Sequence, residues 1–287
     1  MRYLIILILM PLIQYTARSV FRFLIPGPYE FWQTYCMIFI QHVCSIGIPL
    51  LLLYPKKKYY ISNQKERTSI GDVSRFFLLG GCMQLLGTAL NYPFSMLLQH
   101  FGYTLPPALP NPVDGWELIL QTMVVCFTPA ILEEILFRQI IYNEIAAYSK
   151  RSGIFFSALF FSMAHFDLFN LPATLLIGIS LGVLRSRNIS LVKCCFVHFV
   201  INFSASILNL GFNFKTFSEF FHRYYPLTVF LALVLYVAVF PKGQTGDVFI
   251  MKEESKPSTD IYLFKLLKNP LFYLYCILFF TIGVNQL

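Results

Sequence analysis

Residues 116–137 read WELILQTMVVCFTPAILEEILF, an apolar run that contains two adjacent carboxylates, Glu133 and Glu134. A helix needs about 20 mostly apolar residues to cross the hydrocarbon of a bilayer. This run has that length, and it lacks the period-two alternation that is typical of a strand. We therefore predict a membrane-spanning helix that carries ionisable groups inside the bilayer.

Similar apolar runs recur along the whole chain. They lie at 3–24, 31–54, 76–98, 116–137, 154–169, 171–186, 189–211, 224–241 and 270–286. The runs at 154–169 and 171–186 are short and closely connected, so they could form a helical hairpin that does not fully span. The pattern predicts an all-α, polytopic transmembrane bundle of about eight or nine membrane helices rather than a β-barrel.

The composition supports a protein that is covered by the lipid bilayer. Of the 287 residues, 57% are hydrophobic and 13% are charged, whereas about a quarter of the residues in a soluble domain are charged. The formal net charge of +8 could indicate nucleic-acid binding, but the basic residues lie in loops between apolar runs. That placement favours a cytoplasmic membrane face, and we expect no nucleic-acid partner. The seven cysteines all lie in apolar runs without metal-ligand spacing, which favours a packing role.

The loops predict an orientation in the membrane. Lys and Arg gather at 55–75, 150–151, 185–193 and 242–268, whereas 99–115 and 167–172 contain neither residue. The positive-inside rule then places the N-terminus in the cytoplasm. Four basic residues lie on the opposite side: Arg18, Arg22, Lys215 and Arg223. The first run has no clear cleavage site and is expected to be retained, and the compact chain favours a bacterial plasma membrane.

A few polar residues interrupt the apolar runs at one depth. Glu133 lies about 12 Å before Ile141, where the apolar residues that follow Arg138 end, and His198 and His165 lie on the order of 12 and 17 Å from the basic ends of their runs. Because neighbouring runs point in opposite directions, this agreement indicates a single buried polar site, which is a functional hypothesis by default. His42 has a similar depth, and we interpret it as structural or peripheral.

The spacing of these residues suggests their chemistry. Glu134 and Arg138 are four residues apart, which favours an ion pair and leaves Glu133 free to act on a water molecule. His198 and Asn202 share a helical face. A carboxylate, two histidines and an amide can activate water and stabilise an oxyanion. The same histidines with a carboxylate could instead hold zinc.

Other interpretations of the polar residues stay open. They could join helices without any catalysis, form the ion or proton site of a transporter or channel, or belong to a membrane scaffold. The stretch Gly178-Ile-Ser180-Leu-Gly182 imitates a nucleophile elbow. An elbow requires a strand-to-helix turn, whereas this stretch lies in an apolar run, so we interpret the two glycines as a packing face.

Three motifs together resemble those of the CPBP family, which comprises CAAX-type proteases and bacteriocin-processing or self-immunity (Abi) proteins. In chain order they are Glu133-Glu134-x-x-x-Arg138, Phe161-x-x-x-His165 and His198-x-x-x-Asn202. The resemblance covers roughly residues 116–211 and suggests a catalytic helix core. The core would lie between N-terminal membrane helices at 1–115 and C-terminal membrane helices with a cytoplasmic loop at 212–287.

The resemblance implies an intramembrane endopeptidase that acts on membrane-associated peptides or proteins. Glu133 would activate the water with help from His165, and His198 and Asn202 would face the oxyanion. Glu134, Arg138 and Phe161 would support them. Both zinc-dependent and metal-free mechanisms are proposed for the family, and zinc would be bound by Glu133, His165 and His198. Since an amide is a poor zinc ligand, Asn202 favours the metal-free alternative. The substrate stays open among a prenylated C-terminus, a leader peptide, a bacteriocin and a pheromone precursor.

Overall fold

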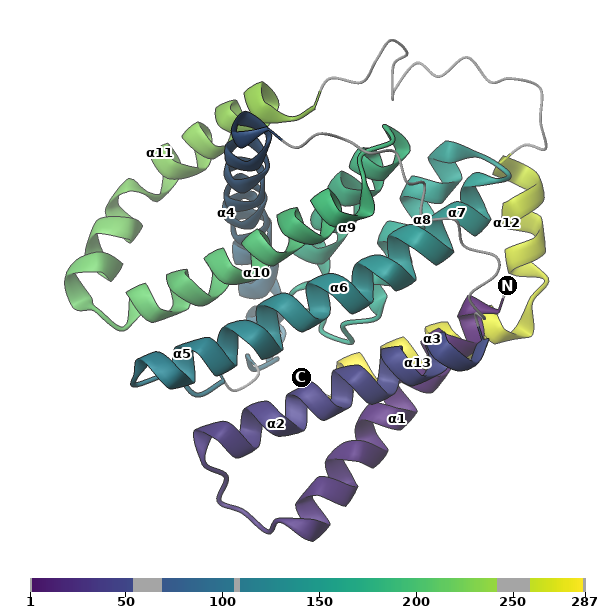
Figure 1. The fold of residues 1–287 in the computed structure, drawn as a ribbon, viewed down its shortest axis with the longest axis horizontal. Helices are drawn as coiled ribbons and strands as arrows, with labels where there is room; N and C mark the ends of the chain where they lie inside the picture. The colour runs from purple at the N-terminus through teal and green to yellow at the C-terminus, as the bar shows by residue number, and fades with distance from the viewer. Residues whose placement is uncertain (1, 54–68, 106–108, 242–258, 286–287) are drawn as a thin grey trace.

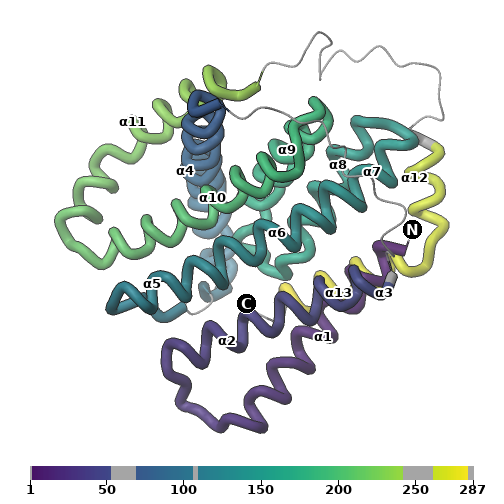
Figure 2. The backbone as a smooth tube through the Cα atoms, viewed as in Figure 1, coloured from purple at the N-terminus to yellow at the C-terminus, as the bar shows by residue number. Residues whose placement is uncertain are grey.

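The structure, a computed structural model, describes residues 2–53, 69–105, 109–241 and 259–285. Its described residues form helices and connecting turns without any strand, which confirms the all-α prediction (Figures 1 and 2). The helices are α1 (Tyr3–Leu24), α2 (Phe31–His42), α3 (Ile48–Leu53), α4 (Ile70–His100), α5 (Gly115–Gln121), α6 (Thr128–Glu134), α7 (Tyr142–Ala146), α8 (Lys150–Met163), α9 (Leu171–Ser186), α10 (Leu191–Phe212), α11 (Lys215–Val239), α12 (Thr259–Leu267) and α13 (Pro270–Asn285).

Three π-helical turns join some of these helices into longer stretches. They are η1 (Val43–Gly47), η2 (Thr122–Phe127) and η3 (Ile135–Ile141). Consequently α2 continues into α3, and α5 continues through α6 into α7 as one helical stretch over Gly115–Ala146. Such wide turns occur frequently at functional sites. Here η1 begins directly after His42 and η3 begins directly after Glu134.

The number of spans differs from the predicted eight or nine. Six helical stretches in the described residues are long and apolar enough to cross a membrane, and the pair Ile261–Leu267 and Pro270–Gly283, bent by 70°, could add a seventh. The helices α8 and α9 have 14 and 16 residues, so they reach about 21 and 24 Å of the roughly 30 Å needed. The short pair at 154–169 and 171–186 is thus the hairpin that the sequence suggested.

One predicted loop is partly helical. The segment 242–268 was expected to be a polar loop, but Thr259–Leu267 forms α12, while 242–258 lies outside the described residues. The Tyr262 hydroxyl of α12 lies 2.6 Å from the Tyr3 hydroxyl of α1, and both side chains are buried. This contact fixes α12 against the N-terminal helix, because each hydroxyl satisfies the other where water is excluded.

The hairpin of α8 and α9 packs through glycine. A Cβ atom on Gly178 would lie 2.9 Å from the Cα atom of Ala158, and one on Gly182 would lie 3.4 Å from that of Ile154. The Ser180 hydroxyl lies 2.9 Å from the Tyr236 hydroxyl of α11 rather than beside a base. This geometry confirms the packing interpretation of the two glycines.

The basic ends of several helices meet at one end of the bundle. Lys193 at the start of α10 lies 3.7 Å from Asp72 at the start of α4, and Arg75 Nε donates to the Val239 carbonyl at the end of α11. The α10–α11 turn, the start of α5 and the α1–α2 turn lie on the opposite side of the molecule, to the left and below in Figure 1. We call the first region the basic end and the second the far end.

Candidate active site

Three histidines from separate segments surround the Glu133 carboxylate. The Nε2 atom of His42, at the end of α2, lies 4.0 Å from Glu133 Oε1. The Nε2 atoms of His165, just after α8, and of His198, on α10, lie 4.0 and 3.9 Å from Glu133 Oε2. The Glu133 side chain is only 11% exposed. Glu133 is thus a buried carboxylate inside a ring of imidazoles, at separations that leave room for a bridging water.

The Nδ1 atom of each imidazole fixes the orientation of its ring. Each hydrogen-bonds to an oxygen that can only accept: the Ile38 carbonyl at 3.0 Å for His42, the Phe161 carbonyl at 2.8 Å for His165, and Glu134 Oε1 at 2.9 Å for His198. Each Nδ1 therefore carries a proton, assigned from its partner. In the neutral form of each ring, the lone pair of Nε2 then faces Glu133.

Glu134 and Arg138 form the ion pair that their spacing predicts. Both side chains are completely buried, with Arg138 Nε 3.3 Å from Glu134 Oε2. The other oxygen of Glu134 accepts the hydrogen bond from His198. None of the Arg138 nitrogens has a hydrogen bond of ordinary geometry to the described residues, so Glu134 supplies its charge compensation. Glu134 thus neutralises a buried cation and also orients a histidine.

Phe161 explains why its motif combines an aromatic ring with a histidine. The Arg138 guanidinium carbon lies 4.4 Å from the centroid of the Phe161 ring, close enough for a cation–π interaction. The same ring meets His165 and His198 nearly edge-on, at centroid distances of 4.9 and 5.7 Å. Phe161 therefore supports the cation and packs against two of the three histidines at once.

One cavity of about 500 Å³ contains all four residues for which the sequence suggested catalysis. Asn202, one helical turn beyond His198 on α10, lines it together with Glu133 and His165. From these residues the lining continues to Leu109, Asn111 and Asn213, which are exposed residues at the far end.

His42 is the site residue that the sequence analysis did not identify. We interpreted it as structural or peripheral, yet its Nε2 atom is as close to Glu133 as that of His165. His42 lies on a helix far from the three motifs and has no polar neighbour at i+4 with which it could form a recognisable pair. Its depth in the second apolar run was the only available signal.

The donor set is suitable for zinc, but its arrangement is not. Neutral imidazole nitrogens and a carboxylate are ordinary zinc ligands, and tetrahedral bonds of about 2.0–2.1 Å would place neighbouring ligands about 3.3 Å apart. The distances from Glu133 to the three histidines are 3.9–4.0 Å. Within the described ranges, no three His, Cys, Asp or Glu side chains are placed to hold a metal ion. We therefore derive no step through zinc.

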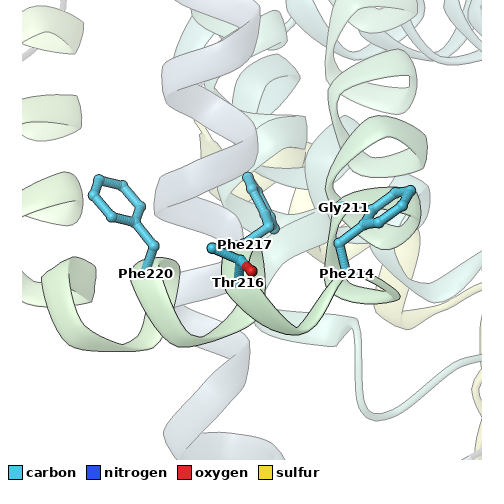
Figure 3. A pocket seen from close by; sticks show the side chains of 5 residues that line it. All are labelled: Gly211, Phe214, Thr216, Phe217 and Phe220. Carbon is cyan, nitrogen blue, oxygen red and sulfur yellow. The ribbon is translucent and has the colours of Figure 1, made fainter.

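A second hollow, of about 520 Å³, lies at the turn between α10 and α11. Figure 3 shows its lining: Gly211, Phe214, Thr216, Phe217 and Phe220. None of these side chains is an acid or a base, and Phe214 and Phe220 are exposed apolar rings. Such a lining suits contact with lipid chains and offers no group that could activate water.

Comparison with known proteins agrees with the geometry. Residues 115–204 match the family described as type II CAAX prenyl endopeptidase Rce1-like, and this range contains all three motifs. The match confirms the predicted resemblance and supports an intramembrane protease of this general kind in a multi-pass membrane protein. No curated protein and no solved structure matches the chain.

Proposed function

We propose that this chain, whose residues 115–204 match the CAAX endopeptidase family, hydrolyses peptide bonds within the membrane with a water molecule activated by Glu133. One observation carries the proposal. With Glu133 ionised and the three rings neutral, the carboxylate and the three Nε2 atoms are all acceptors, and no donor among the described residues lies between them. A molecule that donates hydrogen bonds can satisfy these acceptors, and a water molecule can donate two.

The first step follows from these positions. A water molecule between Glu133 and His165 donates one proton to the carboxylate and hydrogen-bonds to His165 Nε2 with the other. Its oxygen attacks the carbonyl carbon of the peptide bond while Glu133 takes the proton. The negative charge then develops on the carbonyl oxygen, where the Asn202 amide can donate a hydrogen bond.

In the second step, the proton that Glu133 took from water passes to the leaving amine of the substrate. Glu133 Oε2 lies 3.9 Å from His198 Nε2, so the proton can pass to His198 by a short movement. The protonated ring is held by Glu134 at Nδ1 and can donate to the oxyanion or to the leaving amine nitrogen. Proton transfer to that nitrogen breaks the C–N bond, and it leaves Glu133 ionised and all three rings neutral.

The transporter alternative has less support in the structure. An ion path would need polar groups to continue from Glu133 toward the basic end. The turn after Glu134 instead contains Leu136 and Phe137, which are 0% and 1% exposed. The same turn also contains the buried Arg138 guanidinium, so a passing cation would meet a fixed positive charge beside these apolar side chains.

Purified protein tested against a mixture of quenched fluorescent peptides distinguishes these functions. The parent should cleave, and Glu133→Gln should lower kcat by about 10²–10⁴, the usual contribution of a general base. The matched control is Glu219→Gln on α11, where the same change affects a carboxylate that is 67% exposed and remote from the cavity. Equal activity of Glu133→Gln and Glu219→Gln would contradict the proposal.

A further inference from the structure

The cavity at Glu133 extends as a groove between two helical stretches. On α10 and its C-cap the lining residues recur on one face about once per helical turn: His198, Asn202, the adjacent pair Ala205 and Ser206, Asn209 and Asn213. Opposite them, Gln121, Val125, Pro129 and Glu133 follow one face at intervals of four. At 1.5 Å per residue, the two faces are about 22 and 18 Å long, which is the length of about six residues in an extended chain.

The groove changes from buried to exposed along its length. Glu133 and His198 are buried at its inner end, whereas Asn209, Asn213 and Asn111 are exposed at the far end of the bundle. Side-chain amides facing lipid would lose their hydrogen bonds to water at considerable cost. Several amides on one face of a membrane helix therefore indicate a groove that is filled by water or by a ligand.

The lining also defines the chemistry of that ligand. Among the described residues that line it from Gln121 to the mouth, the groove offers amide donors and acceptors but no charged side chain. The Gln121 side chain is 7% exposed, and its buried amide oxygen has no hydrogen-bond partner among the described residues. A peptide backbone, with an N–H and a C=O on almost every residue, is the uncharged ligand that complements such a lining.

The distribution of basic residues predicts on which side of the membrane the groove opens. Basic residues at that end include Arg75, Lys150, Arg151, Arg185, Arg187 and Lys193. In the described part of the far end, the basic residues are Arg18, Arg22, Lys215 and Arg223. The basic end should therefore face the cytoplasm, which places the mouth of the groove on the other side.

We infer that the groove binds an uncharged, extended peptide segment of about six residues that enters from the non-cytoplasmic face of the membrane. The identity of this ligand as substrate rests on the proposed function, whereas its binding and its side of entry do not. Substrates would therefore be segments exposed at the outer surface, with the bond to be cleaved at the buried inner end beside Glu133.

Binding can be measured without turnover. In nanodiscs, the Glu133→Gln variant should bind fluorescein-labelled decapeptides composed of Ala, Ser, Val and Gln, and peptides carrying two Lys and two Glu should bind more weakly. Adding Gln121→Leu should raise Kd about three- to tenfold, because one or two backbone hydrogen bonds are lost. The matched control is Gln99→Leu, the same change on an exposed residue of α4 outside the groove, which should leave Kd unchanged.

A Kd that is indifferent to Gln121→Leu, or equally affected by Gln99→Leu, would overturn the groove as the binding site. If the parent binds these peptides but hydrolyses none in the quenched mixture, the proposed function fails while the binding groove stands. If hydrolysis occurs with no effect of Gln121→Leu on Kd, the groove fails while the chemistry at Glu133 stands.

The side of the membrane on which the groove opens can be tested in sealed right-side-out vesicles. A membrane-impermeant maleimide should label Asn213→Cys at once, and Lys150→Cys, an exposed position at the basic end, only after the vesicles are opened. The parent protein gives the background from its seven native cysteines. The reverse pattern would overturn entry from the non-cytoplasmic face.

Discussion

Replacing Glu134 by glutamine should damage folding, although the adjacent change Glu133→Gln should damage only activity. Glu134 and Arg138 are both completely buried, and the amide would leave the guanidinium without its counter-charge. Breaking a buried ion pair by removing one partner costs about 3–5 kcal/mol. At about 2 °C per kcal/mol for a chain of this size, Tm should fall by roughly 6–10 °C. Thermal unfolding in one detergent, followed by tryptophan fluorescence, measures it.

Two comparisons isolate the cause of that loss. Glu133→Gln makes the same chemical change one residue away, where the carboxylate makes no direct hydrogen bond to the described residues, so Tm should change by less than about 2 °C. Adding Arg138→Met to Glu134→Gln removes the orphaned charge and should recover most of the loss, since apolar replacement of a buried pair is often neutral. A Glu134→Gln protein that melts with the parent, or no recovery in the double variant, would refute this reasoning.

Three further outcomes follow from the structure. His42→Gln should lower kcat about 10- to 100-fold, because the ring lies beside Glu133, and it should change Tm by no more than about 2 °C, because the ring is partly exposed. A kcat equal to that of the parent would indicate that His42 is structural. Prolonged chelation should leave peptide cleavage unchanged, and a loss restored by one equivalent of zinc would establish a metal mechanism. Gly178→Ala should lower the free energy of unfolding by about 1–3 kcal/mol, because its Cβ atom would crowd Ala158. Gly81→Ala is the control and should be tolerated, because the nearest neighbour of its Cβ atom would be 4.0 Å away. Equal Tm values for the two variants would contradict glycine packing in the hairpin.

The helices and most of the site could be predicted because their signals are local. Apolar runs gave the bounds of Tyr3–Leu24 and Leu171–Ser186 as the structure has them. Depth and helical spacing brought together Glu133, His165 and His198, since each property depends on one helix and on the thickness of the bilayer.

The remaining features depend on contacts between distant segments. His42 reaches Glu133 only through the packing of α2 against α5 and α6, which no local pattern encodes. The wide turn η3, directly after the paired glutamates, has no clear sequence signal either. The mouth of the groove lies beside the start of α5 and the end of α10. This position depends on how the helices pack in the assembled bundle and cannot be predicted from one helix alone.

The central claim is that a water molecule attacks the peptide bond directly while Glu133 takes its proton. A single turnover in ¹⁸O-labelled water, with enzyme in excess over a cleaved peptide, tests it by mass spectrometry of the new C-terminus and of the Glu133 side chain. Direct attack predicts one ¹⁸O atom in the first product and none in Glu133. If Glu133 were a nucleophile and water then opened the resulting anhydride at the Glu133 carbonyl, the first product would carry an unlabelled oxygen from Glu133, and the label would appear in Glu133. That result would contradict the account.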